Sequence, residues 1–493
     1  MIAATAESAP ARALAPLDFA VVGVALAILG LIAYLAGRKE KDTRDFFLGG
    51  RSVPVFVATL SFVAAEISAL TVIGVPAVAY SENWHYLQFF VGSAAGRIFV
   101  AFLFIPVFYK HDCTTVFEFL RGRFGPETEY AGSAFFFITR LLGAGVRLYA
   151  ACLGISLIMG WSLAQAILVF TAVSVALIAF GGIKAVVWTG AFEACVFFLA
   201  GALVGSWLLA HIDGGLAEAW RIAGASGRLS VFDFRFDLGD ATTFWAGTAN
   251  AFFVSLAVFG ADQELVQRLL TVRTRRSSQK ALVSTILAAL PLLCCYLALG
   301  TLLFVFYQQR GQPALGKPDE ILGYCVTHTL PAGLKGLVLA AIVMTSIDSP
   351  LSSLSTSFVT NLYRPLIHKS GSERHYLWVS RAGIVGFGLI LIALALECRS
   401  VEKALWLAFK IISITGGSTL GVFLLGILTK RRANAGNIVA MVLSALTCVE
   451  LAVLAQYQYV ALGWSWLIVI GTVETFVLAY LLGPAMESGV PHG

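Results

Sequence analysis

Apolar runs long enough to cross a lipid bilayer constrain this 493-residue chain more than any other feature of its sequence. Residues 17–38, 281–307 and 462–483 each approach or exceed the ~20 residues that span a ~30 Å hydrocarbon core. A soluble core would interrupt such runs with turns every few residues. Because the chain is also 58% hydrophobic and 13% charged, with a mean hydropathy of +0.84, we exclude a soluble protein and predict an all-α integral membrane protein.

Polar breaks between the apolar runs divide the chain into thirteen predicted transmembrane helices. The predicted spans are residues 17–38, 53–79, 86–109, 129–159, 162–180, 185–211, 243–263, 281–307, 335–362, 376–397, 403–428, 437–457 and 462–483. The first apolar stretch is too long for a signal peptide and lacks a clear cleavage site, so we predict that it is retained as the first helix.

The distribution of Lys and Arg predicts how the chain is oriented in the membrane. With the N-terminus outside, 20 of the 34 Lys and Arg residues fall in inward loops and 9 in outward segments. Because positive residues are concentrated on the cytoplasmic side, this bias predicts an outside N-terminus and a cytoplasmic C-terminus in the plasma (inner) membrane. No basic run is interleaved with aromatic residues, so the net charge of +6 does not indicate nucleic-acid binding.

The second predicted span contains a carboxylate and a cluster of small residues where an inert helix would be uniformly apolar. Ala64-Ala65-Glu66-Ile67-Ser68-Ala69 is followed by Gly74 and Pro76. A backbone can unwind at membrane depth only where protein or a water-filled cavity satisfies its freed polar groups. Glu66 is therefore a candidate ligand for a cation or a substrate. The alternative is a structural carboxylate, bonded to a neighbouring helix or shielded by Arg97, Arg140 or Arg147.

The ninth predicted span has the same character. Residues 344–350 read Met-Thr-Ser-Ile-Asp-Ser-Pro, and five further hydroxyl residues follow between 352 and 357. Hydroxyl groups can bond their own helix carbonyls with no further role. Asp348 fits that alternative less well, because a carboxylate inside a span needs a cation, an Arg or a proton. Carbonyls and hydroxyls together could supply five oxygen ligands for Na⁺ without a formal charge, by analogy with harder divalent cations.

Five other acidic residues lie in or beside the spans. Glu193 follows a short inward turn at residues 181–190. Asp262 and Glu264 end the span at 243–263, and we interpret them as solvated or paired with the basic loop that follows. Glu474, like Glu450, falls in the last two helices, away from the polar clusters, and is assigned to packing or interhelical contacts.

Cysteine and histidine placement disfavours a metal centre and an enzyme. The eight cysteines show no CxxC or CxxxH spacing, and most lie in apolar helices. Cys325 and Cys398 fall near the outer side, where a bridge can be considered but has no further support. The seven histidines lie in loops or at span ends, without HExxH or GxSxG motifs.

Several segments together resemble the sodium:solute symporter family, which includes sodium-coupled carriers of sugars, proline, iodide, monocarboxylates and sialic acid. The resemblance covers roughly residues 17–440. It is carried by DFFLGGRS at 45–52, TVFEFL at 115–120 with Arg123-Phe124, GGIKAVVWT at 181–189, DQELVQR at 262–268 and GVFLLGILTKR at 421–431. Their order along the chain is that of the family.

The resemblance implies a leucine-transporter-like fold of two inverted five-helix repeats, with Na⁺ and substrate between them at the midplane. The predicted parts are an extracytoplasmic tail at 1–16, a peripheral helix at 17–38, repeats at 53–211 and 243–428, two helices at 437–483 and a cytoplasmic tail at 484–493. The implied sodium ligands are the carbonyls of Ala64, Ile67 and Ile342 and the hydroxyls of Thr345 and Ser346. No organic cofactor is implied.

The chain departs from the family pattern at positions that bear on ions and substrate. Many members have Asp and then Gln where this chain has Gly190 and Glu193, so Glu193 or Asp348 becomes a candidate accessory cation or proton site together with Glu66. Sugar carriers have Tyr–Glu and Tyr–Trp pairs where this chain has Phe89-Phe90 and Val258-Phe259. We predict a substrate pocket formed by six residues: Glu66, Ser68, Thr71, Phe90, Ser255 and Phe259.

The sequence as a whole predicts a secondary active transporter that takes up a small polar solute with Na⁺ by alternating access. The solute is a sugar, an amino acid or a carboxylate. The Na⁺ gradient and the membrane potential drive uptake. Bound Na⁺ favours one conformation because it has a higher affinity for that conformation than for the other. Two alternatives keep the same fold: a proton-coupled symporter working through Glu66 or Asp348, and a solute sensor or channel without tight coupling.

Overall fold

The computed structural model describes residues 14–37, 48–68, 70–113, 115–178, 183–313, 315–344, 348–400 and 403–487. Within these ranges the protein is built from helices, and its extended backbone pairing is a single bridge between Val53 and Val272. Nine described helices are long and apolar enough to cross a membrane, or eleven when two bent pairs are each counted as one span. Shorter apolar helices occupy the two other predicted spans, at 162–180 and 335–362.

The first half of the chain, up to Ala225, forms α1 and the helices that follow it. The helices are α1 (Pro16–Gly37), α3 (Val55–Glu66), η2 (Leu70–Gly74), α4 (Val75–Ser81), α5 (Phe89–Lys110), α6 (Val116–Arg123), α7 (Pro126–Met159), α8 (Leu163–Ile178), α9 (Ile183–Ala210) and α10 (Gly215–Ala225).

The second half repeats the pattern of a broken first helix followed by long spans. The helices are α11 (Phe244–Gly260), α12 (Gln263–Leu270), α13 (Arg275–Arg310), α14 (Ile321–His328), α15 (Leu334–Met344), α16 (Asp348–Ser357), η5 (Phe358–Ile367), α17 (Glu373–Glu397), α18 (Ala404–Leu428), α19 (Asn434–Gln456) and α20 (Leu467–Glu487).

Local capping explains why several helices begin where they do. Thr115, Thr243, Asp262 and Thr274 each accept a hydrogen bond from a backbone amide in the first turn of the helix that follows. These bonds satisfy amides that have no partner inside the helix. Gly160 ends α7 with a φ of 68°, a left-handed conformation that favours glycine.

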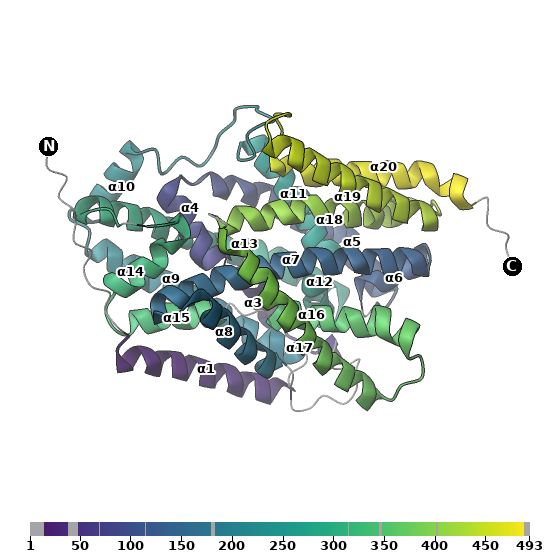
Figure 1. Ribbon diagram of the computed structural model, residues 1–493, viewed down its shortest axis with the longest axis horizontal. Helices are drawn as coiled ribbons and strands as arrows, with labels where there is room; N and C mark the ends of the chain where they lie inside the picture. The colour runs from purple at the N-terminus through teal and green to yellow at the C-terminus, as the bar shows by residue number, and fades with distance from the viewer. Residues whose placement is uncertain are drawn as a thin grey trace.

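The helix α1 lies along one edge of the molecule, beside α15 (Figure 1). It is the most apolar span, and only 11% of its apolar window is buried inside the protein, as expected of a helix that faces lipid. Asp18 is nevertheless fully buried, and its Oδ1 accepts hydrogen bonds from the amides of Gly333 and Gly336 at 2.7 and 2.9 Å. The carboxylate thereby caps the start of α15 and fastens the peripheral helix to the bundle.

The core of the bundle brings α5 and α11 into very close contact. A Cβ built on Gly92 of α5 would lie 2.0 Å from the carbonyl oxygen of Thr248 on α11. Glycine is therefore required for the two backbones to approach this closely. On the far side, α18 packs against α19 and α20, which form the opposite edge of the bundle (Figure 1).

Candidate substrate and sodium site

The first broken span changes direction by 62° just after α3 ends at Glu66. In a continuous helix the amide of Ser68 would bond the carbonyl of Ala64, but it donates to the carbonyl of Glu66 at 3.1 Å. The amide of Thr71 likewise donates to Ser68, at 2.8 Å, and not to Ile67. The break therefore releases the carbonyls of Ala64 and Ile67 from helical pairing. These are two of the three carbonyls that the family resemblance implies as sodium ligands.

The last turns of α15 lie against the same part of α7 as this break. A Cβ built on Gly154 of α7 would lie 2.9 Å from Cδ1 of Ile73 and 3.1 Å from Cδ1 of Ile342. Ile73 belongs to η2 and Ile342 to α15, so segments of both predicted broken spans meet at one glycine. Three predicted cation ligands fall outside the part of the chain that is described: Thr345, Ser346 and the side chain of Asp348.

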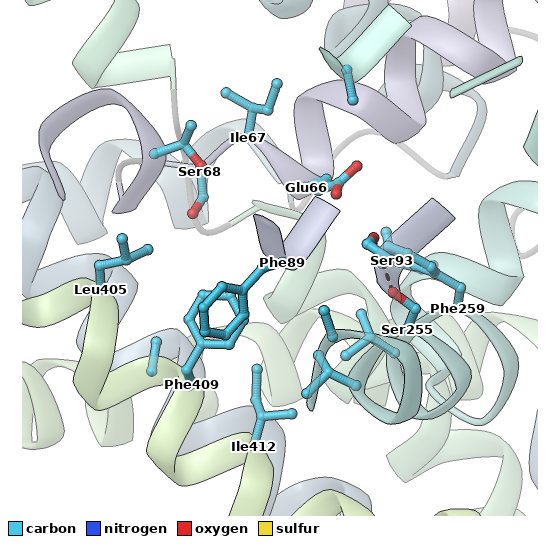
Figure 2. A pocket seen from close by; sticks show the side chains of 18 of the residues that line it. Glu66, Ile67, Ser68, Phe89, Ser93, Ser255, Phe259, Leu405, Phe409 and Ile412 are labelled. Atoms are coloured by element: carbon cyan, nitrogen blue, oxygen red, sulfur yellow. Dashed lines mark hydrogen bonds between the residues drawn. The ribbon is translucent and has the colours of Figure 1, made fainter. Parts of the chain in front are cut away.

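A cavity lies beside the first break, enclosed by α3, α5, α7, α11, α13 and α18. Figure 2 shows Glu66 and Ser68 at one side of it and Ser93, Ser255 and Phe259 at another. The structure places all six predicted substrate residues in the cavity wall: Glu66, Ser68, Thr71, Phe90, Ser255 and Phe259. That they bind a substrate stays a prediction.

Glu66 is held in the cavity wall by a buried arginine. Arg97 of α5 is fully buried and forms an ion pair with Oε1 of Glu66. Its guanidinium also donates to Oγ1 of Thr285 at 2.8 Å and lies 4.9 Å from the ring centroid of Phe259. Among the alternatives for this carboxylate, the structure selects pairing with Arg97. Oε2 of Glu66 has no hydrogen-bond partner among the described residues, so it can accept a bond from water, a cation or a substrate.

A second group of charges joins α7 to the break between α11 and α12, which are bent by 58°. Arg140 forms ion pairs with Asp262 and Glu264, and Arg147 lies 3.4 Å from Glu264. Both acidic side chains are buried. The prediction that they are solvated or paired with the following basic loop is therefore wrong. Their partners are on a distant helix, because burial beside α7 requires compensating charge.

Arg147 is the cation of this group that is best placed to bind a solute. Arg140, Arg147 and Asp262 all line the cavity, and the Arg147 side chain is 20% exposed, compared with 8% for Arg140. Arg140 forms close ion pairs with two carboxylates. Arg147 contacts one of them, Glu264, at the longer distance of 3.4 Å. A guanidinium has five N–H donors and matches a carboxylate in a bidentate geometry.

The departure at Gly190 has a structural counterpart on α12. Arg268 donates a hydrogen bond to the carbonyl oxygen of Ser61 at 3.0 Å and another to its hydroxyl. A Cβ built on Gly190 would lie 3.0 Å from Nη1 of Arg268 and 2.8 Å from Oγ of Ser61. The missing side chain leaves room for this guanidinium. Glu193, one turn further along α9, is buried but is not part of the cavity wall.

Other predicted features have plain outcomes. Oε1 of Glu474 accepts a hydrogen bond from the hydroxyl of Thr447 at 2.9 Å, an interhelical contact of the predicted kind. Glu450 is exposed on α19. All eight cysteines are free, so the bridge considered between Cys325 and Cys398 does not form.

Sequence reasoning missed several residues of the cavity wall. Ser93 of α5 bonds Ser255 at 3.0 Å and receives N–H groups of Arg97, and Phe409 and Ile412 enter the wall from α18. The phenylalanine and isoleucine carry no signal in the sequence, because an apolar residue in a span has the same pattern whether it faces a cavity or lipid. Ser93 stands in a small-residue segment, Gly92-Ser93-Ala94-Ala95-Gly96, which could have identified it.

The model of the sodium:solute symporter family matches residues 46–444 of this chain. The sodium-coupled monocarboxylate transporter 2 of Danio rerio is 30% identical over 425 residues, covering 83% of this chain and 67% of the relative. The sodium/sialic acid symporter NanT of Aliivibrio fischeri is 27% identical, covering 94% of this chain and 92% of the relative. The chain thus spans about two thirds of the monocarboxylate transporter and nearly all of the bacterial symporter.

Solved structures support the same assignment. The substrate-bound outward-open structure of a Na⁺-coupled sialic acid symporter is 25% identical, with a TM-score of 0.85 and coverage of 96% of this chain and 98% of the other. The nucleobase-cation symporter Mhp1 is 14% identical, with a TM-score of 0.57 over 90% of this chain and 93% of the other, a likeness of fold. The predicted leucine-transporter-like fold is confirmed.

These comparisons assign the chain, with its broken helices and its cavity, to a known class of membrane protein. The predictions of a transporter, of Na⁺ as coupling ion and of no enzymatic activity are confirmed. The chain belongs to the sodium:solute symporter family, and it is a multi-pass membrane protein that couples Na⁺ to the transport of a small solute.

Proposed function

We propose that this protein imports a small organic carboxylate with Na⁺, and that Arg147 binds the carboxylate. One observation carries the proposal: the guanidinium of Arg147 lines the cavity, and its one ion pair among the described residues is the 3.4 Å contact with Glu264. The names of the relatives agree with this chemistry, since they include a monocarboxylate transporter and sialic acid symporters, and sialic acid is itself a carboxylate.

Charge balance supports the same pairing of ion and solute. The described charged groups in and beside the cavity are Arg97, Arg140 and Arg147 on one side and Glu66, Asp262 and Glu264 on the other, so they compensate one another. An isolated charge is costly to bury in a protein interior. One Na⁺ and one carboxylate that enter together keep the interior neutral, whereas either one alone does not.

The sodium site in this proposal lies between the break after α3 and the end of α15. The carbonyls of Ala64, Ile67 and Ile342 and the hydroxyls of Thr345 and Ser346 are its ligands. Support comes from the helical bonds that Ala64 and Ile67 lose, and from the contact of η2 and α15 at Gly154. Since the ligands belong to two separate segments, bound Na⁺ favours the conformation in which the segments are close, and the repeats then alternate between outward and inward access.

Proton coupling through Glu66 is the weaker alternative. Its carboxylate is paired with Arg97, and protonation would break that pair and leave the guanidinium buried without its counter-charge. The orientation that we propose, with the N-terminus outside and the C-terminus in the cytoplasm, rests on the distribution of Lys and Arg.

Uptake by purified protein in proteoliposomes tests the proposal. An inward Na⁺ gradient should drive uptake of labelled pyruvate or nicotinate, and an equal K⁺ gradient should not. Arg147→Gln should raise the carboxylate concentration for half-maximal uptake about tenfold or more, because a hydrogen bond to a charged group contributes ~1.5–3 kcal/mol. Stabilisation of the variant by Na⁺ alone should be unchanged.

Arg310→Gln is the matched control, because Arg310 ends α13 outside the cavity and is 39% exposed. It should behave as the wild type does. Uptake of glucose or amino acids without carboxylate uptake, or an unchanged half-maximal concentration in Arg147→Gln, would contradict the proposal.

A further inference from the structure

The cavity has two chemically different ends. Phe89 and Arg97 both lie on α5 and are separated by about 12 Å at 1.5 Å of rise per residue. Phe89 stands at the aromatic end of the cavity, whereas Arg97 pairs with Glu66 in the polar wall. Arg147 and Asp262 belong to the charged group at the break between α11 and α12. The cavity wall is therefore amphipathic.

Five rings, which we call the aromatic cluster, close one end: Tyr86, Phe89, Trp406, Phe409 and Trp464. Neighbouring ring centroids lie between 5.7 Å, for Tyr86 and Trp406, and 6.3 Å, for Phe89 and Trp464. Tyr86, Phe89 and Phe409 line the cavity. Figure 2 shows the rings of Phe89 and Phe409 next to one another, and their centroids lie 5.9 Å apart. This end therefore offers ring faces and edges to a ligand, an arrangement that suits stacking with another flat ring.

Much of the remaining cavity wall is hydrocarbon. Val254, Val258 and Phe259 of α11, Leu293 of α13 and Ile412 of α18 are all in its wall.

Several of the hydroxyl groups that reach the wall are already bonded within the protein. Ser255 bonds Ser93, which also receives N–H groups of Arg97. The hydroxyl of Thr139 donates to the carbonyl of Phe135 on its own helix. A ligand that carries many hydroxyl groups would bury them against apolar side chains, and each hydroxyl without a partner is costly.

We propose that the preferred substrate is an aryl carboxylate: its carboxylate binds Arg147 and its ring stacks on Phe89 and Phe409 of the aromatic cluster. This inference rests on the proposed function, since it takes from it the carboxylate bound by Arg147. It adds the orientation of the ligand and the chemical class of the group attached to the carboxylate, which is an aromatic ring. Polyhydroxylated sugar acids, including sialic acid, are poorer ligands for the same cavity, because most of its wall is apolar and several of its hydroxyl groups are already bonded within the protein.

Thermal stabilisation of the purified protein in Na⁺ tests this assignment with three sets of sodium salts. Benzoate, phenylacetate and nicotinate are the aryl carboxylates, acetate and propionate the short ones, and gluconate and N-acetylneuraminate the sugar acids. A ligand that binds the folded state raises the melting temperature by mass action, so each half-stabilising concentration can be compared. The aryl carboxylates should act at concentrations at least about tenfold lower than those of the other two sets.

Phe409→Leu separates ring stacking from general apolar contact, because it keeps apolar volume and removes the ring. It should raise the half-stabilising concentration of aryl carboxylates about three- to tenfold and leave that of acetate within about twofold. Phe102→Leu is the control, since Phe102 lies on α5 outside the cavity and is 68% exposed. It should change neither value.

The outcomes separate this inference from the proposed function. If no carboxylate stabilises the protein in Na⁺, the proposed function fails and this inference with it. If acetate or the sugar acids stabilise as well as the aryl carboxylates do, or if Phe409→Leu affects all ligands equally, only the aryl assignment is overturned.

Discussion

Gly190 on α9 faces a buried guanidinium at a position where a side chain would not fit. Arg268 of α12 bonds the backbone carbonyl of Ser61 on α3, and a Cβ on Gly190 would lie within 3.0 Å of both side chains. Helices α3, α9 and α12 therefore pack closely at Gly190, where there is no space for a methyl group. The resemblance to the symporter family places an Asp here in many members, and in this chain the space beside Gly190 is occupied by Arg268 and Ser61.

Gly190→Ala should destabilise the protein by ~1–3 kcal/mol, because added volume in a packed interior forces neighbouring side chains or backbone to move. Thermal unfolding in detergent measures the loss. Gly205→Ala on the same helix is the control, because its Cβ would meet nothing closer than Cδ1 of Leu302 at 3.9 Å. The control should be neutral or slightly stabilising, since Ala favours helix over Gly. Equal melting temperatures for the two variants would contradict this account.

The sequence identified important residues where a charged side chain is costly to bury in a membrane. It did not identify the residues with which those side chains pair. Glu66 is a carboxylate inside an apolar span, so its importance could be predicted. Its partner could not, because Arg97, Arg140 and Arg147 all lie on later spans and their distances depend on packing. Asp262 and Glu264 were assigned wrongly for the same reason: the basic loop nearest in sequence is not nearest in space.

At the scale of elements, α7 and α12 are joined mainly through Glu264, which contacts both Arg140 and Arg147. Glu264→Gln should lower stability by about 3 kcal/mol or more, because removing one partner of a buried ion pair leaves the other charge uncompensated. The measurement is again the melting temperature. Glu218→Gln removes an exposed ion pair with Arg221 on α10 and should change it little. A loss in the control as large as that in Glu264→Gln would show that burial is not the cause.

The start of α18 depends on a buried carboxyl in the short η4 turn (Pro318–Glu320), outside the spans. Asp319 accepts a hydrogen bond from the amide of Ala404 at 2.9 Å. Burial raises the pKa of Asp319 to about 6, an effect that Lys317 and Lys403 oppose and Glu320 reinforces. Because the pKa is raised, the folded state binds this proton more tightly than the unfolded chain does. The contribution of Asp319 to stability therefore increases as the pH falls through 6.

Asp319→Asn keeps an oxygen that can accept the bond from Ala404 but removes the titration. The variant should be more stable than the wild type at pH 7.5, by up to about 3 kcal/mol. The difference should shrink below pH 6 and disappear near pH 4. Melting temperatures of both proteins across this range measure it, and a difference that does not change with pH would contradict the assignment to Asp319.

Hydrophobic length was enough to predict where helices occur, and it failed to predict how two of them are broken. Each of the thirteen predicted spans contains helix in the structure. The break after Glu66 was predicted from its small and polar residues. The segment after Phe259 was interpreted as a helix end at the membrane surface, yet α12 is buried along its whole length. Its polar residues suggested a solvated position, but Gln263, Glu264 and Arg268 each bond a partner inside the protein.

At the scale of the whole molecule, the cavity is formed by helices that lie far apart in the chain. Its wall takes Glu66 from α3 and Phe409 from α18, which are 343 positions apart. Neither the composition nor the periodicity of the sequence predicts that these helices lie together. The resemblance to the symporter family supplied it, and the sialic acid symporter structure confirmed it at the level of fold. The solute was not predictable, because solute choice depends on apolar side chains whose orientation the sequence does not reveal.

The central claim is that Na⁺ bridges the break after α3 and the segment that follows α15. The most direct test is the Na⁺ dependence of carboxylate uptake in proteoliposomes for the wild type, Thr345→Ala and Ser346→Ala, with Arg310→Gln as the control. Each hydroxyl variant should require a severalfold higher Na⁺ concentration for half-maximal uptake, because it loses one oxygen ligand, and should approach the wild-type rate at saturating Na⁺. The same Na⁺ dependence in both hydroxyl variants as in the wild type would contradict the claim.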